Sequence, residues 1–419
     1  MATTKVSTAR APITPRGSFF PCYLMGHAIR TQQATGILDE LWATALALEV
    51  DGGKVLWVTV ELIGLDREFT DRIRDCAARQ YQLPAEAVNI SYVHTHSAPE
   101  YQEHSIFAQA GQGAVPGYMD YVEQQINAAI DACFAGEWVP VQVFAKQLEI
   151  AGCYGNRNGL QKPADKTFVA LKFCAQDGSV VAGACSFACH STVLGPQNLQ
   201  VSSDLAGYVA RAFLQQWGVY PIVMVGAAGD MSNRLYRQGN DKAELDRVGQ
   251  EMMSQVFASP AAETELQLRR PVVETYRYQQ TFVPDAAKKQ QQYDIIKEKI
   301  EHAANFDEKK VYSSALRMAE YRLTQQDPYE LDLECQYVDL GDLRLFVIPA
   351  ELFSRFGLRV KQALGAKCPV CWCYSNYSAG YLGNIEDYGN SFETSASDIT
   401  PGTTEHIVEQ IEQFLAQRR

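Results

Sequence analysis

Strand-like and helix-like segments alternate along the first half of this 419-residue chain, and this alternation limits its fold more than any other feature. Largely apolar runs at 45–50 and 54–62 are joined at Asp51-Gly52-Gly53, which is a hairpin signal. Helical spacing follows at 67–81, and a short strand is expected at 88–93. The pattern predicts an α/β fold of mixed β-sheets flanked by helices, in which strand ends present functional side chains.

The alternation continues downstream. Strands are expected at 168–174, 180–189 and 221–225, and a helix is expected at 205–217. Residues 284–326 differ, because they are rich in Lys, Gln, Glu and Ala and poor in β-branched residues. That composition predicts a helical hairpin. We expect this hairpin to be an insertion within one domain that spans residues 1–419.

Composition excludes several classes of function. The formal net charge is −12, and no long basic run is present, so nucleic acid and anionic membranes are poor candidate partners. The first 20 residues lack the apolar stretch of a secretory signal, and no run of about 18 apolar residues occurs. We therefore expect a cytoplasmic protein without a membrane anchor. Because acidic enzymes of this size often self-associate, a homo-oligomer is an alternative to a monomer.

The eleven cysteines are an odd number without a repeating spacing, which favours reduced thiols over a disulfide framework. Cys368, Cys371 and Cys373 form a cluster that suggests a metal or redox site. A structural zinc site needs a second pair of ligands, and no such pair stands out. We favour small apolar side chains on a buried strand.

Three of the seven histidines, His94, His96 and His190, lie at or just beyond the end of an apolar strand. Residues two apart in a strand face the same way, so His94 and His96 can both point into one site. Imidazole is the commonest protein ligand of zinc. A His-x-His pair alone is weak support for a metal, and a structural pair is the alternative. His190 strengthens the metal interpretation because it repeats the same arrangement.

The glycine-rich turn at 226–233 contains a carboxylate, Asp230, and a hydroxyl, Ser232. It matches neither a phosphate-binding loop nor the GxSxG elbow of serine hydrolases. Ser232 is a candidate nucleophile only if the fold brings a histidine to it. A tight turn beside the site is the alternative.

At these residues the chain resembles the catalytic domain of the neutral, non-lysosomal ceramidase family. Four segments carry the resemblance, in the family's order and across nearly the whole chain. They are His94-Thr95-His96-Ser97-Ala98-Pro99, then Cys189-His190-Ser191-Thr192 with Val201–Gly207, then Ala227–Ser232, and finally Pro349-Ala350-Glu351 with Ser375–Tyr381.

The resemblance implies an amide hydrolase with one zinc ion per chain. Its implied zinc ligands are His94, His190, Glu351 and Tyr381, with Tyr377 as the alternative tyrosine. It further implies substrate-contacting roles for His96 and Arg157, and Ser232 matches a serine once assigned as nucleophile. Asp230, in the same segment as Ser232, is a further candidate catalytic residue. In a metal mechanism, Ser232 lines or positions the site.

The chain also departs from the family pattern. Ala98 replaces a usual glycine, Phe392 stands where the family often has a tyrosine that touches substrate, and Asn233-Arg234 replaces Pro-Asn. We further expect the chain to lack the immunoglobulin-like domain of the secreted ceramidases. We therefore expect a small, soluble N-acyl substrate. The alternatives are a true ceramidase, a metal-independent serine hydrolase acting through Ser232, and a non-catalytic binding protein.

The remaining histidines are expected to be non-ligands. His302 and His406 lie in polar helical stretches, while His27 and His104 lie near loops and can line a cavity. Glu61 lies at the end of an apolar strand. It either faces the site or caps the end of that strand.

Overall fold

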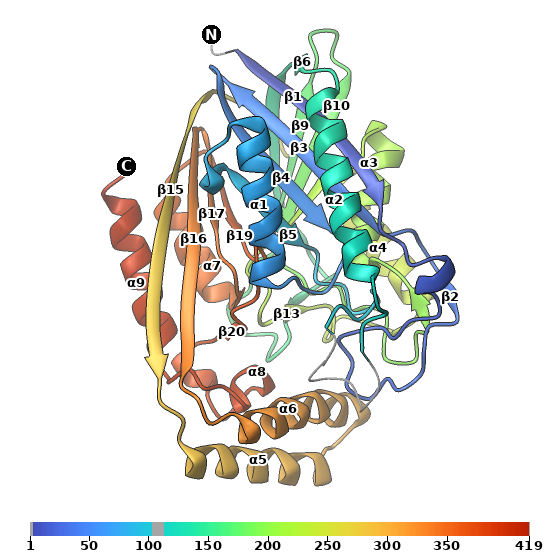
Figure 1. Cartoon of the computed structure of the whole chain (residues 1–419), viewed down its shortest axis with the longest axis vertical. Coiled ribbons are helices and arrows are strands. Elements are labelled where there is room, and N and C mark those ends of the chain that lie inside the picture. The colour runs from blue at the N-terminus through green and yellow to red at the C-terminus, as the bar shows by residue number, and fades with distance from the viewer. Residues whose placement is uncertain (1–2, 103–112, 419) are drawn as a thin grey trace.

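Three larger β-sheets form the centre of the molecule (Figure 1), for which a computed structural model describes residues 3–102 and 113–418. The first sheet has the strand order β5-β4-β3-β1-β6. Its strands are β1 (Thr4–Pro12), β3 (Trp42–Val50), β4 (Gly53–Val60), β5 (Val88–Tyr92) and β6 (Val139–Pro140). The β4–β5 pair is parallel, so both strands end at the same edge of the sheet.

The second sheet has the order β12-β10-β9-β7-β14, and the third has the order β15-β16-β17-β19. The strands of the second are β7 (Gln142–Glu149), β9 (Thr167–Cys174), β10 (Val180–Phe187), β12 (Ile222–Val225) and β14 (Thr264–Leu266). Those of the third are β15 (Leu268–Phe282), β16 (Tyr329–Gly341), β17 (Leu343–Val347) and β19 (Cys368–Trp372). Parallel pairs β10–β12 and β17–β19 again bring strand ends together.

Strand periodicity explains how one strand serves two layers. In β3, Leu46 and Leu48 belong to a buried cluster between the three sheets, whereas Ala45 and Ala47 belong to the cluster beneath the helices. Side chains two apart share a face of a strand, so the alternation of large and small apolar residues separates the two cores. Trp57 and Trp372 meet edge-to-face within the inter-sheet cluster.

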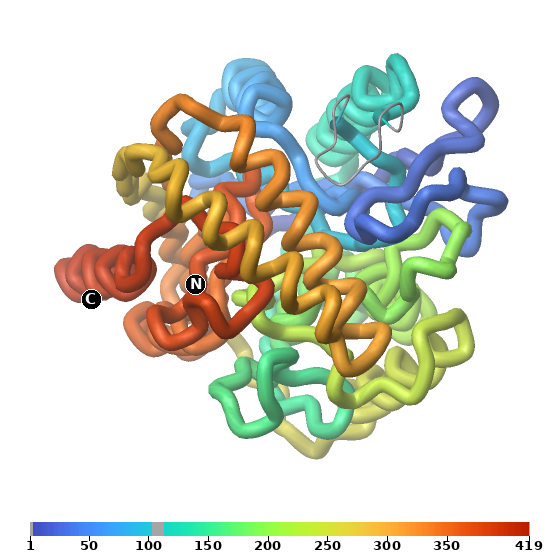
Figure 2. The backbone as a smooth tube through the Cα atoms, turned by 90° about the horizontal axis from the view of Figure 1, so that it is seen from below, coloured from blue at the N-terminus to red at the C-terminus, as the bar shows by residue number. Residues whose placement is uncertain are grey.

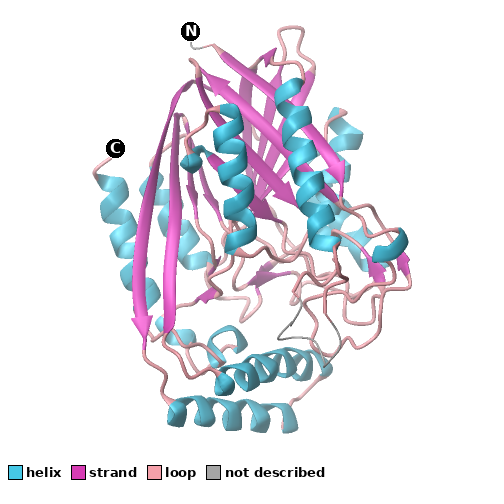
Figure 3. Ribbon diagram, in the orientation of Figure 1, coloured by secondary structure: helices cyan, strands magenta, loops and turns pink. Residues whose placement is uncertain are grey.

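Helices cover the other faces of the sheets (Figure 3). Helices α1 (Arg67–Tyr81) and α2 (Tyr118–Ala135) pack on the first sheet, and α3 (Asp204–Trp217) packs on the second beside α4 (Lys242–Ala258). The third sheet is covered by α7 (Ser354–Leu364) and α9 (Thr403–Ala416). Each buries apolar residues at turn spacing, as in Ile407, Ile411 and Leu415 of α9.

Helices α5 (Ala286–Glu301) and α6 (Phe306–Thr324) lie side by side across one end of the molecule (Figure 2). Each begins at a capping side chain: Asp285 accepts a hydrogen bond from the Lys288 amide, and Asn305 accepts one from the Glu308 amide. They occupy the stretch in which we expected a helical hairpin. That they form an insertion in a single domain stays a prediction.

The predicted α/β class is confirmed, and Cys368 to Trp372 form a buried strand as expected. All eleven cysteines lie in the described part of the chain and are free. Within that part, no helix is both long and apolar enough to cross a bilayer.

Candidate metal centre

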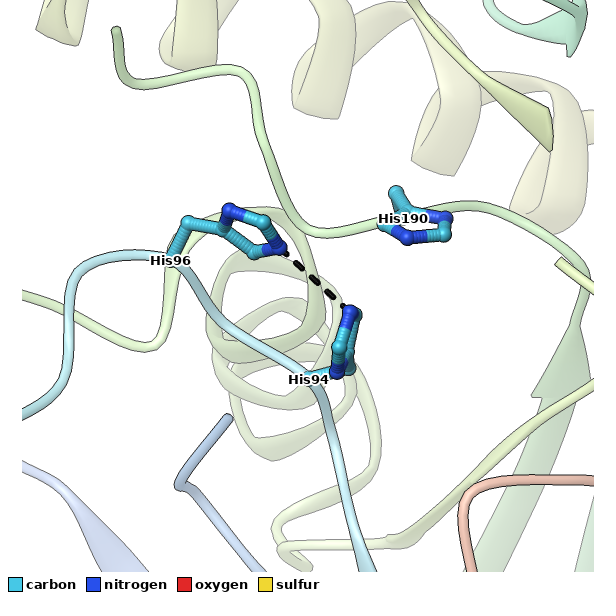
Figure 4. Close-up of side chains that lie close together, drawn as sticks. All are labelled: His94, His96 and His190. Atoms are coloured by element: carbon cyan, nitrogen blue, oxygen red, sulfur yellow. Dashed lines mark hydrogen bonds between the residues drawn. The ribbon is translucent and has the colours of Figure 1, made fainter. Parts of the chain in front are cut away.

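The three histidines meet where strands β5 and β10 end (Figure 4). A parallel bridge between Thr95 and Ser191 joins the two following segments, and the His96 amide donates to the Ser191 carbonyl at 3.2 Å. One ring nitrogen from each of His94, His96 and His190 lies within 4.8 Å of the others. The structure therefore brings together the three histidines that the sequence singled out.

Backbone carbonyls orient these rings. The Nδ1 atom of His94 lies 2.6 Å from the Ile63 carbonyl oxygen, and that of His190 lies 2.6 Å from the Ala228 carbonyl oxygen. Nδ1 of His96 lies 3.0 Å from the Gly26 carbonyl oxygen. Because a carbonyl only accepts hydrogen bonds, Nδ1 carries the proton and Nε2 keeps its lone pair.

Burial keeps the imidazoles neutral. It lowers the pKa of His94 and of His96, and it lowers the pKa of His190 to about 3 despite the neighbouring carboxylate of Glu351. The Nε2 atoms of His94 and His96 lie 3.4 Å apart. Unprotonated nitrogens that face one another at this distance repel unless a cation lies between them.

Glu351 supplies the negative charge. It begins the short strand β18 (Glu351–Leu352), and its Oε2 atom lies 3.1 Å from Nε2 of His190 and 3.4 Å from Nε2 of His94. Burial opposes ionisation, but the charged forms of His94 and His190, together with Arg157, outweigh it and lower the pKa of Glu351 to about 2. When both imidazoles are neutral, the guanidinium of Arg157 remains as the positive charge that favours the carboxylate. A carboxylate therefore faces two neutral imidazoles.

Tyr381 lies beside Glu351 because β18 pairs in parallel with β20 (Tyr381–Leu382), and these two residues are partners in register. Arg157 donates from Nη2 to the Tyr381 hydroxyl at 3.3 Å. The hydroxyl of Tyr377 is used elsewhere: it donates to the Asp332 carbonyl at 2.6 Å and accepts from the Glu334 amide at 2.8 Å. The Tyr377 hydroxyl is thus engaged with two backbone groups, whereas the Tyr381 hydroxyl is contacted by Arg157; that Tyr381 is the ligand stays a prediction.

Arg157 is held rigidly in the site. Its Nε donates to Glu393 at 2.7 Å and its Nη2 donates to the Gly229 carbonyl at 2.7 Å, and both side chains of the ion pair are buried. Burial opposes the charge of Arg157, but Glu393 outweighs it and raises its pKa above the ordinary range. The guanidinium is thus a fixed positive charge next to Tyr381.

The two polar side chains of the turn, Asp230 and Ser232, have different surroundings. Ser232 lines the cavity, and its hydroxyl accepts from the Arg234 amide at 3.2 Å. Among the described residues, no hydrogen bond joins this hydroxyl to an imidazole. Asp230 is outside the cavity lining: its carboxylate accepts from Asn156 and from the amide and hydroxyl of Ser354. These hydrogen bonds anchor the turn, and a catalytic role for Asp230 stays a prediction.

One residue beside the histidines, Tyr374, was not predicted from the sequence. The Tyr374 ring lies 4.7 Å from the His94 ring, and its buried hydroxyl has no hydrogen-bond partner among the described residues. Both Tyr374 and His94 have positive φ, 56° and 57°, in the left-handed region that non-glycine residues rarely adopt. Such strain is concentrated at functional sites and needs tight surroundings to persist.

The other histidines lie outside the cluster. His27 lines the cavity, and its ring lies 5.2 Å from that of His96. His302 and His406 are exposed, whereas His104 is outside the described residues. Glu61 is buried away from the cavity and accepts from the Tyr220 hydroxyl and the Trp42 amide.

The donor set fits a divalent cation. Ring nitrogens of three neutral imidazoles lie close together beside the ionised carboxylate of Glu351, and Nδ1 of each histidine is already hydrogen-bonded. Zinc prefers nitrogen and carboxylate ligands of this kind, oriented by outer hydrogen bonds. The cluster opens into a cavity of about 430 Å³ that extends to helix α6.

Comparison with known proteins identifies relatives. Residues 5–220 match the family model described as neutral/alkaline non-lysosomal ceramidase, N-terminal. Neutral ceramidase from Drosophila pseudoobscura pseudoobscura is 27% identical over 228 residues, which is 50% of this chain and 32% of that protein. Neutral ceramidase from Oryza sativa subsp. japonica is 26% identical over 211 residues, 46% of this chain and 27% of that protein. These matched regions span about a third of the relatives' length.

A solved structure has the same fold. The crystal structure of neutral ceramidase from Pseudomonas aeruginosa superposes with a TM-score of 0.72 and 17% sequence identity, covering 99% of this chain and 74% of that chain. At this identity the likeness concerns the fold.

Proposed function

Because this chain belongs to the neutral/alkaline non-lysosomal ceramidase family, we propose that it is a zinc-dependent hydrolase that cleaves the amide bond of a small, soluble N-acyl substrate. One observation carries the proposal. Nε2 of His190 and Nε2 of His94 lie 3.1 and 3.4 Å from the same oxygen of Glu351, at the base of a cavity. A cluster of ligands that opens to a cavity is the arrangement of a catalytic rather than a structural metal.

We assign His94, His190, Glu351 and Tyr381 as the ligands of one zinc ion. Bound zinc supplies Lewis-acid chemistry, because it lowers the pKa of a water molecule and polarises the amide carbonyl. The ligand side chains are preorganised by the backbone carbonyls of Ile63 and Ala228.

His96 is assigned to proton transfer. Its Nδ1–H donates to Gly26, so its Nε2 is free to accept a proton from the attacking water. The same nitrogen then returns the proton to the leaving amine as the C–N bond breaks, which yields a carboxylic acid and an amine. The fixed guanidinium of Arg157 stabilises the negative charge that develops on the amide oxygen.

Ceramidase activity itself is the second candidate, and it is favoured by the names of the relatives. A ceramide is a neutral N-acyl lipid. A fluorescent ceramide in detergent therefore belongs in the same assay as soluble N-acyl compounds.

The test combines metal content with turnover. Elemental mass spectrometry should find about one zinc per chain in the wild type and in His302→Ala, whose histidine is exposed, and far less in His190→Ala and Glu351→Ala. The zinc-loaded wild type should hydrolyse at least one N-acyl compound, and chelation should abolish the activity. Wild-type protein that takes up no zinc, or zinc-loaded protein that leaves the whole panel intact, contradicts the proposal. Labelling of metal-free protein at Ser232 by a fluorophosphonate would instead favour serine chemistry.

A further inference from the structure

Three cationic side chains in the cavity lining, Arg234, Arg237 and Lys310, gather where the segment after Ser232 meets helix α6. A further lining cation of this helix, Arg322, is paired with Asp398 at 2.7 Å and is not counted with them. Arg234 and Arg237 follow the turn of Ser232, and Lys310 comes from the helix. Segments about 70 residues apart in the chain therefore build one wall of the substrate cavity. We call these three residues the cationic wall.

The cationic wall has too few counter-ions. Arg237 forms an ion pair with Asp307, and Lys310 lies 3.8 Å from the same carboxylate. Arg234 forms no ion pair with any residue in the described part of the chain. Among the described residues, the wall thus has three positive charges beside one negative charge.

Neighbouring acidic groups do not correct this balance. Glu393 is already committed to Arg157, which it contacts at 2.7 Å. Asp307 is partly exposed, with 38% of its side chain accessible, so its effect on the buried Lys310 is partly screened by solvent.

Burial makes the unbalanced charge costly. Lys310 is 7% exposed, and burial together with Arg237 and Arg234 lowers its pKa to about 8. Burial and Arg157 lower the pKa of Arg234 to about 10. Natural proteins rarely keep such cations together without an anion, so the cluster points to a ligand that brings one.

An aromatic ring connects the wall to the metal centre. The Phe392 ring lies under two guanidinium groups, 4.8 Å from that of Arg157 and 5.5 Å from that of Arg234. The Tyr381 ring is 6.2 Å from the Phe392 ring. Tyr381 at the metal centre and Arg234 in the wall therefore flank the same aromatic ring.

We propose that the cavity takes N-acyl compounds that carry an anionic group, a carboxylate, sulfonate or phosphate, and that this group binds against Arg234, Arg237 and Lys310. The assignment of the amide to the other end rests on the proposed function. A neutral substrate would leave the wall without its counter-ion. Charge on the substrate is thus a determinant of specificity in this chain.

Four compounds with one frame, CH3CO–NH–CH2–CH2–X, provide the test. N-Acetylethanolamine is neutral, whereas N-acetyl-β-alanine, N-acetyltaurine and N-acetyl-O-phosphoethanolamine carry the three anions. Binding is measured by calorimetry on metal-free protein, where no turnover occurs, and kcat/KM is measured on zinc-loaded protein. At least one anionic compound should bind about tenfold or more tightly than the neutral one, since a charge-assisted hydrogen bond contributes on that order. The anion that binds best identifies the head group.

The variants separate the wall from general charge effects. The double variant Arg234→Met, Lys310→Met keeps unbranched apolar stems and removes two charges, so it should fold, as circular dichroism will check. Its preference for anions should fall below about threefold. Arg317→Met is the matched control: Arg317 lies on the same helix, pairs with Glu320 and is outside the cavity lining, so the preference should persist.

The outcomes distinguish this inference from the proposed function. Equal binding of neutral and anionic compounds, no detectable binding of any, or an unchanged preference in the double variant overturns it. If zinc-loaded protein hydrolyses neutral amides without preferring anions, the proposed function stands and this inference falls. If the protein prefers anionic compounds but hydrolyses none of them, this inference stands and the proposed function falls.

Discussion

Nε2 of His190 and Oε2 of Glu351 lie 3.1 Å apart, although 161 residues separate them in the chain. The histidine follows the end of β10, and the glutamate follows the end of β17, so two different sheets contribute to one contact. Burial keeps the imidazole neutral, and the surrounding groups keep the carboxylate ionised. The pair is therefore in the protonation state that a divalent metal requires.

Zinc should stabilise the fold through this pair. Free zinc at 100 times its dissociation constant is expected to raise the free energy of unfolding by about 2.7 kcal/mol, because it binds the folded state alone. Urea unfolding with and without a chelator measures the difference. His190→Ala should lose this zinc-dependent stabilisation, whereas His302→Ala, which changes an exposed histidine, should retain it. Equal stabilisation of both variants would place the zinc elsewhere.

Gly229→Ala should weaken zinc binding without touching a ligand. A Cβ atom at Gly229 would lie 2.4 Å from the Glu351 carbonyl oxygen, so the Glu351 backbone must move. Displacing the support of a metal ligand typically costs about 10- to 100-fold in affinity. Titration against a chromophoric chelator gives the dissociation constant. Gly36→Ala is the control, because its new Cβ would meet nothing closer than 3.8 Å; equal affinities in both variants would refute the packing argument.

The two tyrosines should behave differently when each loses its hydroxyl. Tyr381→Phe removes the hydroxyl of the proposed tyrosine ligand, whose residue is the register partner of Glu351, so the zinc dissociation constant should rise about tenfold or more. Tyr377→Phe removes hydrogen bonds to Asp332 and Glu334, so it should lower stability by about 1 kcal/mol and leave zinc affinity within about twofold. Chelator competition and urea unfolding measure the two effects. The opposite pattern would make Tyr377 the ligand.

The regular elements were predictable because apolar periodicity is local. Helix α1 has the expected bounds, Arg67–Tyr81, and β5 ends one residue earlier than expected. The long strand β15, Leu268–Phe282, was not predicted. Most of its residues are exposed or only partly buried on both faces, so it lacks the apolar alternation by which a strand is recognised.

The candidate site was predictable only in part. His94, His96 and His190 stand at strand ends that the sequence reveals, whereas Glu351 and Tyr381 depend on the two-residue strands β18 and β20, which are too short to show any periodicity. The cationic wall arises where helix α6 meets the segment after Ser232. Such contacts join segments that are distant in the chain, so the spacing of residues in the sequence does not predict them.

Glu61 should make stability depend on pH. Burial raises its pKa from an ordinary 4.5 to about 7, although hydrogen bonds from Tyr220 and Trp42 oppose the shift. Between these values the folded state holds a proton that the unfolded state has lost. The stabilising contribution is therefore complete below pH 4.5 and is lost as pH rises through 7. The difference corresponds to about 3 kcal/mol.

Glu61→Gln removes this titration and keeps a group that can accept from the Trp42 amide. The unfolding free energy of the variant minus that of the wild type should rise by about 3 kcal/mol from pH 4.5 to pH 8, measured by urea unfolding of chelated protein. Asp204 and Asp230, whose pKa values burial raises to about 6, are present in both proteins, so their contributions cancel in the difference. Parallel curves of unfolding free energy against pH for the two proteins would mean that Glu61 ionises as readily in the folded chain as in the unfolded chain. The Tyr220 hydroxyl would then donate its hydrogen bond to a charged carboxylate.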